Sequence, residues 1–267
     1  MKKINLKKLT VVLGTVMALV LVLAGCGNTK KDAKSELVGD DKTLTVGLEG
    51  TYAPYSYRQD GKLKGFEVEL GQAMAKKMGL KAKFVPTKWD SLIAGLQAKK
   101  FDVVINNVTV TKERKKQFIF STPYIYSKSA LIVPKDSKLK SVDDIKGKKF
   151  PEGTGTENAI YAEKFGANVM PSDTFQNTVS LISEGRAQGT INSREAFYSW
   201  AKDNPDNKLK VTEIPTSKIP ASEIAAMFNK QSPALRDKAN KALKELQADG
   251  TLTKLSKKYF MTDITKK

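Results

Sequence analysis

The sequence contains no histidine and only one cysteine, Cys26, among its 267 residues. The absence of histidine excludes Ser-His-Asp and Cys-His catalysis and removes the most common metal ligand in proteins. A single cysteine forms no intramolecular disulfide and supplies no thiolate cluster for a structural zinc. These absences predict no metal site and no catalysis by a histidine- or cysteine-based triad, and we also expect no cofactor.

Acidic residues are scarce relative to basic ones, with 28 Asp and Glu against 46 Lys and Arg, which gives a formal net charge of +18. Four lysines in the first eight residues have no acidic neighbour, so the rest of the chain carries +14. Excess positive charge is typical of nucleic-acid-binding proteins. The lysines are scattered, however, and no helix-turn-helix, zinc-finger or RNA-binding signature accompanies them. We interpret the charge as a solvated surface that faces anionic membrane lipid, and expect no nucleic-acid partner.

The N-terminus has the pattern of an export signal. Residues 1–8 are cationic, residues 9–25 are apolar, and Cys26 follows directly. A charged region before an apolar region is typical of a signal peptide, although the apolar stretch alone also approaches the length of a transmembrane helix. The junction Leu23-Ala24-Gly25-Cys26 resembles the bacterial lipobox, whose cysteine becomes diacylated and forms the new N-terminus.

This pattern predicts a signal peptide over residues 1–25, lipid attachment at Cys26, and a polar, flexible tether over residues 26–41. Each buried CH₂ of an acyl chain contributes about 0.8 kcal/mol, so two chains hold a protein stably on a bilayer. We expect the folded part to lie outside the cell membrane, on the extracellular face, as in Gram-positive bacteria.

From residue 42 onward, strand and helix patterns alternate. Alternating or continuous apolar residues predict strands over 44–48, 82–85 and 101–105, and helical spacing predicts helices over 66–78 and 90–99. Asp60-Gly61 between short apolar segments predicts a hairpin turn. This β-α-β-α-β alternation is typical of a mainly parallel sheet with helices on both faces.

A second, smaller α/β unit follows in the pattern. We expect it to contain strands over 130–133, near 169 and over 189–191, a short helix from 141, and helices over 157–165 and 174–184. After this unit we expect a strand over 223–228 and helices over 232–248 and 252–259.

Eight motifs occur in one order along the chain. They are EGTYAPY (49–55), GFEVEL (65–70), PTKWDSL (86–92), FDVV (101–104), TVTKER (109–114), FSTPY (120–124), ADGTL (248–252) and KYF (258–260). Together they resemble the polar amino-acid solute-binding proteins of ABC importers, over about residues 42–263. The first and third motifs most resemble the cystine-binding subgroup.

The resemblance implies an α/β fold of the type II periplasmic-binding-protein class. Two lobes with mainly parallel or mixed sheets are joined by two crossover strands, with lobe one at 42–127 plus 220–263 and lobe two inserted at 131–215. The lobes of such proteins close on a ligand by hinge motion. The implied function is that of a monomer that captures a polar amino acid, with cystine favoured, and delivers it to an ABC permease.

The resemblance also implies how the ligand's α-carboxylate is held. Arg114 matches the family arginine, whose planar guanidinium pairs with both carboxylate oxygens. Thr109 matches an assisting hydroxyl, and Asn107 matches a position whose backbone carbonyl accepts from the α-ammonium. Thr156 matches a residue of lobe two that offers a backbone N–H and a hydroxyl, just before a helix whose dipole favours an anion.

Three further positions match the walls of the family cleft. Tyr52 and Trp89 match aromatic residues that enclose the aliphatic part of a ligand. Glu49 matches a position that contacts the ligand side chain and pairs with a second ammonium, as in cystine, or with the cation of lysine or arginine. The alternatives are core packing for the two aromatic residues, a solvated carboxylate for Glu49 and a surface guanidinium for Arg114.

The strand that ends near Ser193 departs from the family pattern. Ser193 stands where an Asp usually holds the α-ammonium, and Glu195 is a candidate replacement. Loss of a charge-assisted hydrogen bond costs about 1.5–3 kcal/mol. Gln188-Gly189 and Pro151 are also unusual at their positions. The alternatives left open are weak binding, specificity for a basic or other polar amino acid, and a ligand with no free α-amine.

Two further classes of protein compete with a binding protein. A dehydratase-like enzyme on the same fold needs a general acid in the cleft, for which Glu49, Glu152 and Glu195 are candidates. None of them lies in a recognisable catalytic motif, so we expect the protein not to be an enzyme. A receptor or adhesin shares the ligand trap, but the chain contains no kinase, transmembrane or repeat segment to carry a signal.

Overall fold

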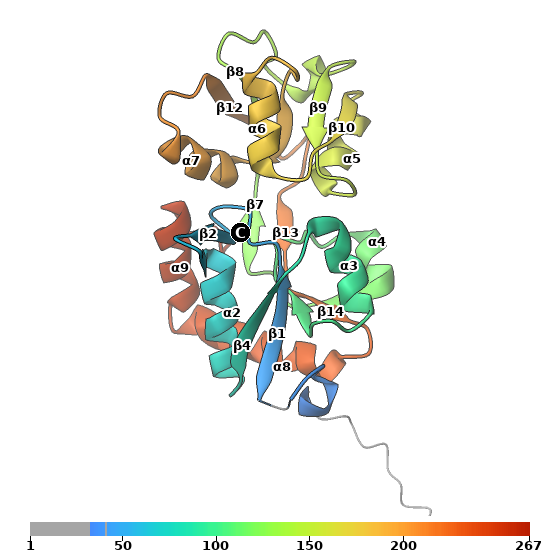
Figure 1. The fold of residues 1–267 in the computed structure, drawn as a ribbon, viewed down its shortest axis with the longest axis vertical. Helices are drawn as coiled ribbons and strands as arrows, with labels where there is room; N and C mark the ends of the chain where they lie inside the picture. The colour runs from blue at the N-terminus through green and yellow to red at the C-terminus, as the bar shows by residue number, and fades with distance from the viewer. Residues whose placement is uncertain (1–32, 41) are drawn as a thin grey trace, which may run out of the picture. The chain divides into compact units, whose positions relative to one another are not determined.

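The computed structural model describes residues 33–40 and 42–267 (Figure 1). The predicted signal peptide and the lipid-attachment residue Cys26 lie outside these residues. Ala33–Lys267 forms one compact unit. Within the described part, no helix is both long enough and apolar enough to span a membrane.

A five-stranded mixed sheet organises the first group of elements, in the strand order β4-β1-β5-β14-β6. Its strands are β1 (Thr43–Leu48), β4 (Lys81–Pro86), β5 (Val103–Val104), β6 (Phe118–Phe120) and β14 (Met227–Asn229). β1 is parallel to β4 and β5, as the alternating pattern predicts. β14 is antiparallel to both β5 and β6, so the C-terminal part of the chain completes a sheet that the N-terminal part begins.

Helices cover both faces of this sheet, with α2 and α9 on one side and α3 and α4 on the other (Figure 1). They are α2 (Phe66–Lys77), α3 (Trp89–Gln97), α4 (Lys112–Gln117), α8 (Pro233–Ala248) and α9 (Thr251–Phe260). Phe66, Leu70 and Met74 of α2 are completely buried, which confirms the apolar face that their spacing predicts.

The predicted hairpin consists of β2 (Tyr57–Gln59) and β3 (Lys62–Lys64). Asp60 and Gly61 have φ of 51° and 72°, as a two-residue turn of type I′ requires. The hairpin lies between the loop that carries Tyr52 and the start of α2.

The second group of elements contains a three-stranded antiparallel sheet, β11-β8-β12, and a parallel pair, β9 with β10. Its elements are β8 (Ser129–Pro134), η2 (Val142–Asp144), β9 (Lys149–Glu152), α5 (Glu157–Lys164), β10 (Asn168–Pro171), α6 (Phe175–Ser183), β11 (Thr190–Ser193), α7 (Arg194–Asp203) and β12 (Leu209–Glu213). The sequence patterns missed β9, α7 and β12.

Two antiparallel strands, β7 (Ile125–Ser127) and β13 (Ser222–Ile224), run between the two groups (Figure 1). The prediction of one strand over 223–228 is therefore wrong. β13 pairs with β7, whereas β14 joins the five-stranded sheet, and Ala225 between them donates its N–H to the carbonyl of Val108 at 3.2 Å. The limits of the two lobes stay a prediction.

The end of the expected tether is folded. Ala33–Glu36 forms a 3₁₀ helix, η1, and Ala33 is buried. Glu36 accepts a hydrogen bond from the Leu235 N–H at 2.8 Å, and Asp102 accepts one from the Val38 N–H at 2.5 Å. The prediction of a flexible segment over 26–41 is thus wrong for residues 33–38, because Glu36 bonds to the first turn of α8 and Val38 bonds to Asp102.

Candidate functional site

A cavity of about 890 Å³ is lined by residues from both groups of elements. Its volume lies within the usual range for small-molecule sites. Seven of the nine predicted site residues line it: Glu49, Tyr52, Trp89, Asn107, Thr109, Arg114 and Thr156. Ser193 and Glu195 are not among the lining residues, and Asn192 takes their place.

Arg114 extends from α4 toward the second group. Thr111 begins the helix and accepts from the Arg114 N–H at 3.1 Å. The guanidinium donates from Nη1 to the carbonyl of Thr109 at 2.9 Å and from Nη2 to that of Gly155 at 3.4 Å, and lies 5.3 Å from the centre of the Trp89 ring. Burial lowers its pKa, an effect that Glu157 opposes. The side chain is thus a held cation at the cavity wall, suited to a carboxylate.

The turn of residues 153–156 lies opposite Arg114. Its last residue, Thr156, is the N-cap of α5: its hydroxyl accepts from the Ala159 N–H at 3.2 Å and donates to the carbonyl of Gly153 at 2.8 Å. Trp89 donates its ring N–H to the carbonyl of Thr154 at 2.9 Å. Thr156 therefore caps α5 and lines the cavity at the same time.

Glu49 is held by an amide side chain. Its backbone N–H donates to Asn106 Oδ1 at 2.7 Å, and Asn106 Nδ2 donates to Glu49 Oε2 at 2.8 Å. Burial raises the pKa of Glu49, the Asn106 bond opposes this, and the nearby Asp90 charge adds to it. The carboxyl therefore lies in the cavity in a fixed orientation, next to a second acid.

Asn107 adopts a left-handed backbone with φ of 47°, a conformation that asparagine tolerates better than most residues. Its N–H donates to Glu67 Oε1 at 2.6 Å, and the Tyr124 hydroxyl donates to the same oxygen. Glu67 is completely buried, and burial raises its pKa to about 7. Sequence reasoning missed this supporting residue, although a charged residue within an apolar helix start was a visible signal.

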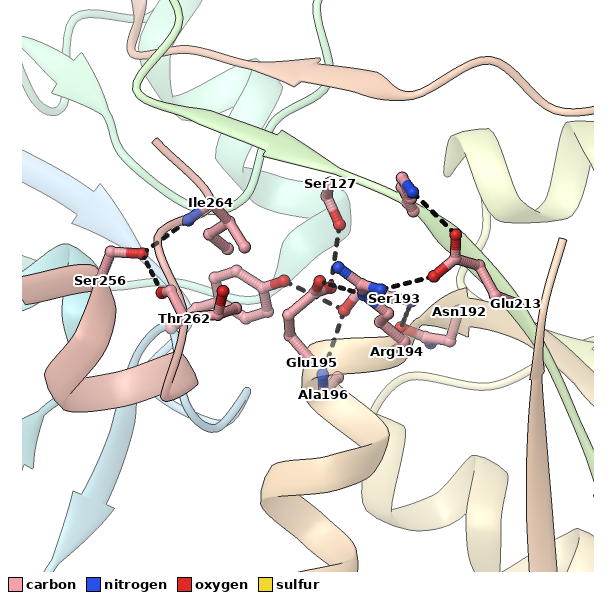
Figure 2. A network of polar contacts seen from close by, with 12 residues as sticks. Ser127, Asn192, Ser193, Arg194, Glu195, Ala196, Glu213, Ser256, Thr262 and Ile264 are labelled. Atoms are coloured by element: carbon pink, nitrogen blue, oxygen red, sulfur yellow. Dashed lines mark hydrogen bonds and ion pairs between the residues drawn. The ribbon is translucent and has the colours of Figure 1, made fainter. Parts of the chain in front are cut away.

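Ser193 and Glu195 contact other parts of the protein instead of the cavity (Figure 2). Ser193 is the N-cap of α7 and accepts from the Ala196 N–H at 3.2 Å and the Tyr55 hydroxyl at 3.0 Å. Glu195 accepts from Ser127 at 3.2 Å and pairs with Arg194 at 2.9 Å. Because α7 begins directly after Ser193, its first turn directs both side chains away, and the expected cavity roles lack geometric support.

Glu152 lines the cavity although it is only 2% exposed. Its Oε1 accepts from the Thr190 hydroxyl and from the Ile191 N–H, both at 2.8 Å. Burial raises its pKa to about 8, against the effect of these two bonds. The neighbouring Pro151 has no N–H, so this carboxyl joins β9 to β11 where a backbone bond is missing.

The residues that the structure describes contain no group of three or more His, Cys, Asp or Glu placed to hold a metal ion. The cavity lining combines the held guanidinium of Arg114, the aromatic rings of Tyr52, Trp89 and Phe175, and several carboxyls. This arrangement suits a small zwitterionic molecule.

Comparison with known proteins gives a matching family model over residues 44–262, the bacterial extracellular solute-binding proteins, family 3. The L-cystine-binding protein TcyJ of Escherichia coli K12 is 40% identical over 94% of this chain and 95% of its own. A probable amino-acid ABC transporter-binding protein of Haemophilus influenzae is 38% identical over 86% of this chain and 90% of its own.

Solved structures agree with this result. The arginine-, lysine- and histidine-binding protein ArtJ of Geobacillus stearothermophilus has a TM-score of 0.79 at 31% identity, over 83% of this chain and 96% of its own. The L-cystine solute receptor of Neisseria gonorrhoeae has a TM-score of 0.60 at 38% identity, over 86% and 97%. The chain belongs to the bacterial extracellular solute-binding proteins of family 3: it is an amino-acid-binding component of an ABC importer with the type II periplasmic-binding-protein fold, and not an enzyme.

Proposed function

We propose that this protein captures a free polar amino acid, with cystine favoured, in the cavity between its two groups of strands and delivers it to an ABC permease. The observation that carries the proposal is the position of Arg114, which extends across the cavity to the turn of residues 153–156. A carboxylate between them meets a guanidinium on one side and the N-terminus of α5 on the other.

The other lining residues fit the rest of an amino acid. Tyr52 and Trp89 offer aromatic faces to an aliphatic chain, and Glu49 offers a carboxylate to a distal ammonium. Two relatives have cystine as their stated ligand, TcyJ of E. coli and TcyA of Bacillus subtilis, at 40% and 34% identity. Cystine carries such a distal ammonium. The arginine-binding protein ArtP of B. subtilis, at 32% identity, supports a basic amino acid as the alternative.

The proposal includes attachment to the outer face of the cell membrane through a diacylated Cys26, as in Gram-positive bacteria, and action as a monomer. The proposed membrane attachment rests on the lipobox-like junction at residues 23–26. Labelling with a radioactive fatty acid tests the anchor, and a Cys26→Ser variant that keeps the label would contradict it.

A ligand screen tests the function. The mature chain with Cys26→Ser is screened by thermal shift against the twenty amino acids and cystine, because a ligand that binds only the folded state raises the unfolding temperature. We expect cystine to give the largest shift. A larger shift with arginine or lysine contradicts cystine as the ligand, and no shift with any amino acid contradicts the proposed function.

The substitution Arg114→Ala tests the site. Two charged hydrogen bonds to a carboxylate contribute about 1.5–3 kcal/mol each, so the affinity should fall by at least about a hundredfold. Titration calorimetry measures this loss, and Lys115→Ala is the control, because Lys115 lies on the same helix and is exposed. Unchanged affinity in folded Arg114→Ala protein contradicts the site assignment.

A further inference from the structure

Glu152 lies between two parts of the second group that border the cavity, the turn of residues 153–156 and the strand β11. It ends β9 and directly precedes the turn of residues 153–156, to which we assign the ligand carboxylate. Its Oε1 is held by the side chain and backbone of β11, at Thr190 and Ile191, within three residues of Ser193. The carboxyl therefore lies between the assigned carboxylate site and the end of β11.

Within residues 33–40 and 42–267, only one oxygen of this carboxyl accepts hydrogen bonds. Oε1 accepts two hydrogen bonds, whereas no hydrogen bond to Oε2 is present among the described residues. Oε2 is also absent from the buried polar side-chain atoms of the described chain that have no partner. Oε2 is therefore not fully buried, and because Glu152 lines the cavity, the cavity is where this oxygen is accessible to a ligand.

A free α-amino acid needs an anion or carbonyl beside its ammonium. The family pattern places an Asp at position 193, but Ser193 caps α7 and bonds Tyr55. Glu195 pairs with Arg194 at the far side of that turn. Another candidate, Glu157, accepts from the Ser222 hydroxyl at 2.8 Å and lies in the helix turn that faces Arg114.

We propose that the carboxylate of Glu152 binds the α-ammonium of the ligand and so replaces the acid that is missing at position 193. This inference rests on the proposed function, since it assumes a ligand with a free α-amine. It assigns to β9 a specificity role that the family pattern gives to the end of β11.

Protonation makes this role measurable. With a pKa of about 8, Glu152 carries its proton at neutral pH. From β11, the Thr190 hydroxyl and the Ile191 amide face the Glu152 carboxyl. From β10, the Ser172 N–H donates to the backbone carbonyl of Glu152. No charged side chain of the described chain contributes to the shift in the pKa of Glu152. An ammonium in contact lowers a carboxyl pKa by about 1–3 units, enough to ionise Glu152. The proton passes to the buffer.

Titration calorimetry at pH 7 in two buffers of different ionisation enthalpy, phosphate and Tris, measures this proton. The titrants are L-cystine, L-arginine and L-glutamine, which share the α-ammonium. For each one that binds, we expect release of about 0.4–0.9 proton, because a shift of about 1–3 units takes a group with a pKa of about 8 from mostly protonated to half or fully ionised at pH 7. In Glu152→Gln the release disappears and affinity falls by about tenfold or more.

Glu163→Gln is the control, because Glu163 is exposed on α5 away from the cavity lining, and it should behave as wild type. Circular dichroism confirms that Glu152→Gln is folded. Three outcomes overturn this inference but not the proposed function. They are binding by the wild type without proton release, an affinity of Glu152→Gln equal to that of the wild type, and loss of proton release and affinity in Glu157→Gln instead of in Glu152→Gln. Tighter binding of N,N′-diacetyl-L-cystine than of L-cystine overturns the ammonium contact. No binding of any free amino acid overturns both.

Discussion

At the scale of single residues, the buried carboxyls of Glu67 and Glu152 are the unusual features. Both are 2% exposed or less, and burial raises the pKa of Glu67 to about 7 and that of Glu152 to about 8. Neither group faces a cation that offsets its burial, so the folded protein favours their neutral forms. Each therefore binds a proton more tightly in the folded state than in the unfolded state.

This difference predicts how stability depends on pH. Unfolded glutamate has a pKa near 4.3, so between about pH 4.5 and 7 the folded state holds a proton on Glu67 that the unfolded state has lost. Stability contributed by neutral Glu67 is present below this window and is lost as the pH rises through 7. In Glu67→Gln, the fall in unfolding free energy with pH should be shallower by about 1.4 kcal/mol per pH unit.

Urea unfolding at pH 5, 6 and 7 measures this slope. The control is Glu113→Gln, because the Glu113 side chain is 78% exposed and its substitution should leave the slope unchanged. An unaltered slope in Glu67→Gln shows that Glu67 is ionised in the folded protein.

At the scale of elements, close packing at the start of β11 fixes how the second group is assembled. Gly189 directly precedes β11, and a Cβ at this position lies 2.8 Å from the carbonyl oxygen of Ile132 and 3.0 Å from the Phe150 ring. The first of these contacts is with the backbone of β8, which cannot rotate away. A glycine therefore lets β11 approach β8 and the aromatic core of β9.

Gly189→Ala should lower the unfolding free energy by about 1–3 kcal/mol, the usual cost of adding a methyl group to a filled site. Urea unfolding measures the change, with Gly39→Ala as the control because a Cβ at Gly39 meets no atom within 4 Å. Equal stability of the two variants would contradict the close contact.

The helices and strands differ in how well the sequence predicts them. Helices such as α2 and α8 were predicted within one or two residues, because a helix of 12 or 16 residues shows its apolar spacing over several turns. β6 and β7 have three residues each, too few to show an alternation of apolar and polar residues, so the sequence does not predict which strands they pair with. The family motifs indicated the Arg114 side of the cavity, but not Glu152, whose role depends on contact with a strand 38 residues away.

At the scale of the whole described chain, hydrogen bonds join the two groups of strands across the cavity. The Tyr52 hydroxyl donates to Asn192 at 2.5 Å, and the Tyr55 hydroxyl donates to Ser193 at 3.0 Å. Tyr55 is fully buried and is not a lining residue, so its bond acts on the arrangement of the two groups and not on the ligand directly.

Tyr55→Phe removes this bond and keeps the ring. A hydrogen bond contributes about 0.5–1.5 kcal/mol, so the contact between the two groups of strands loses stability and amino-acid affinity should fall by about two- to tenfold. Titration calorimetry measures the affinity, and Tyr198→Phe is the control, because Tyr198 is 54% exposed on α7. Reduced thermal stability with unchanged affinity would show that the bond between Tyr55 and Ser193 has no effect on ligand binding.

The docking of η1 onto the body of the protein has a consequence for encounter with the permease. If Cys26 carries the lipid, seven residues, 26–32, connect the bilayer to the first residue of η1, whereas the tether expected from sequence has sixteen. At about 3.4 Å per residue, the maximum reach falls from about 55 Å to about 25 Å. A shorter linker confines the binding protein to a thinner layer above the lipid, which raises its effective concentration at any membrane-embedded partner.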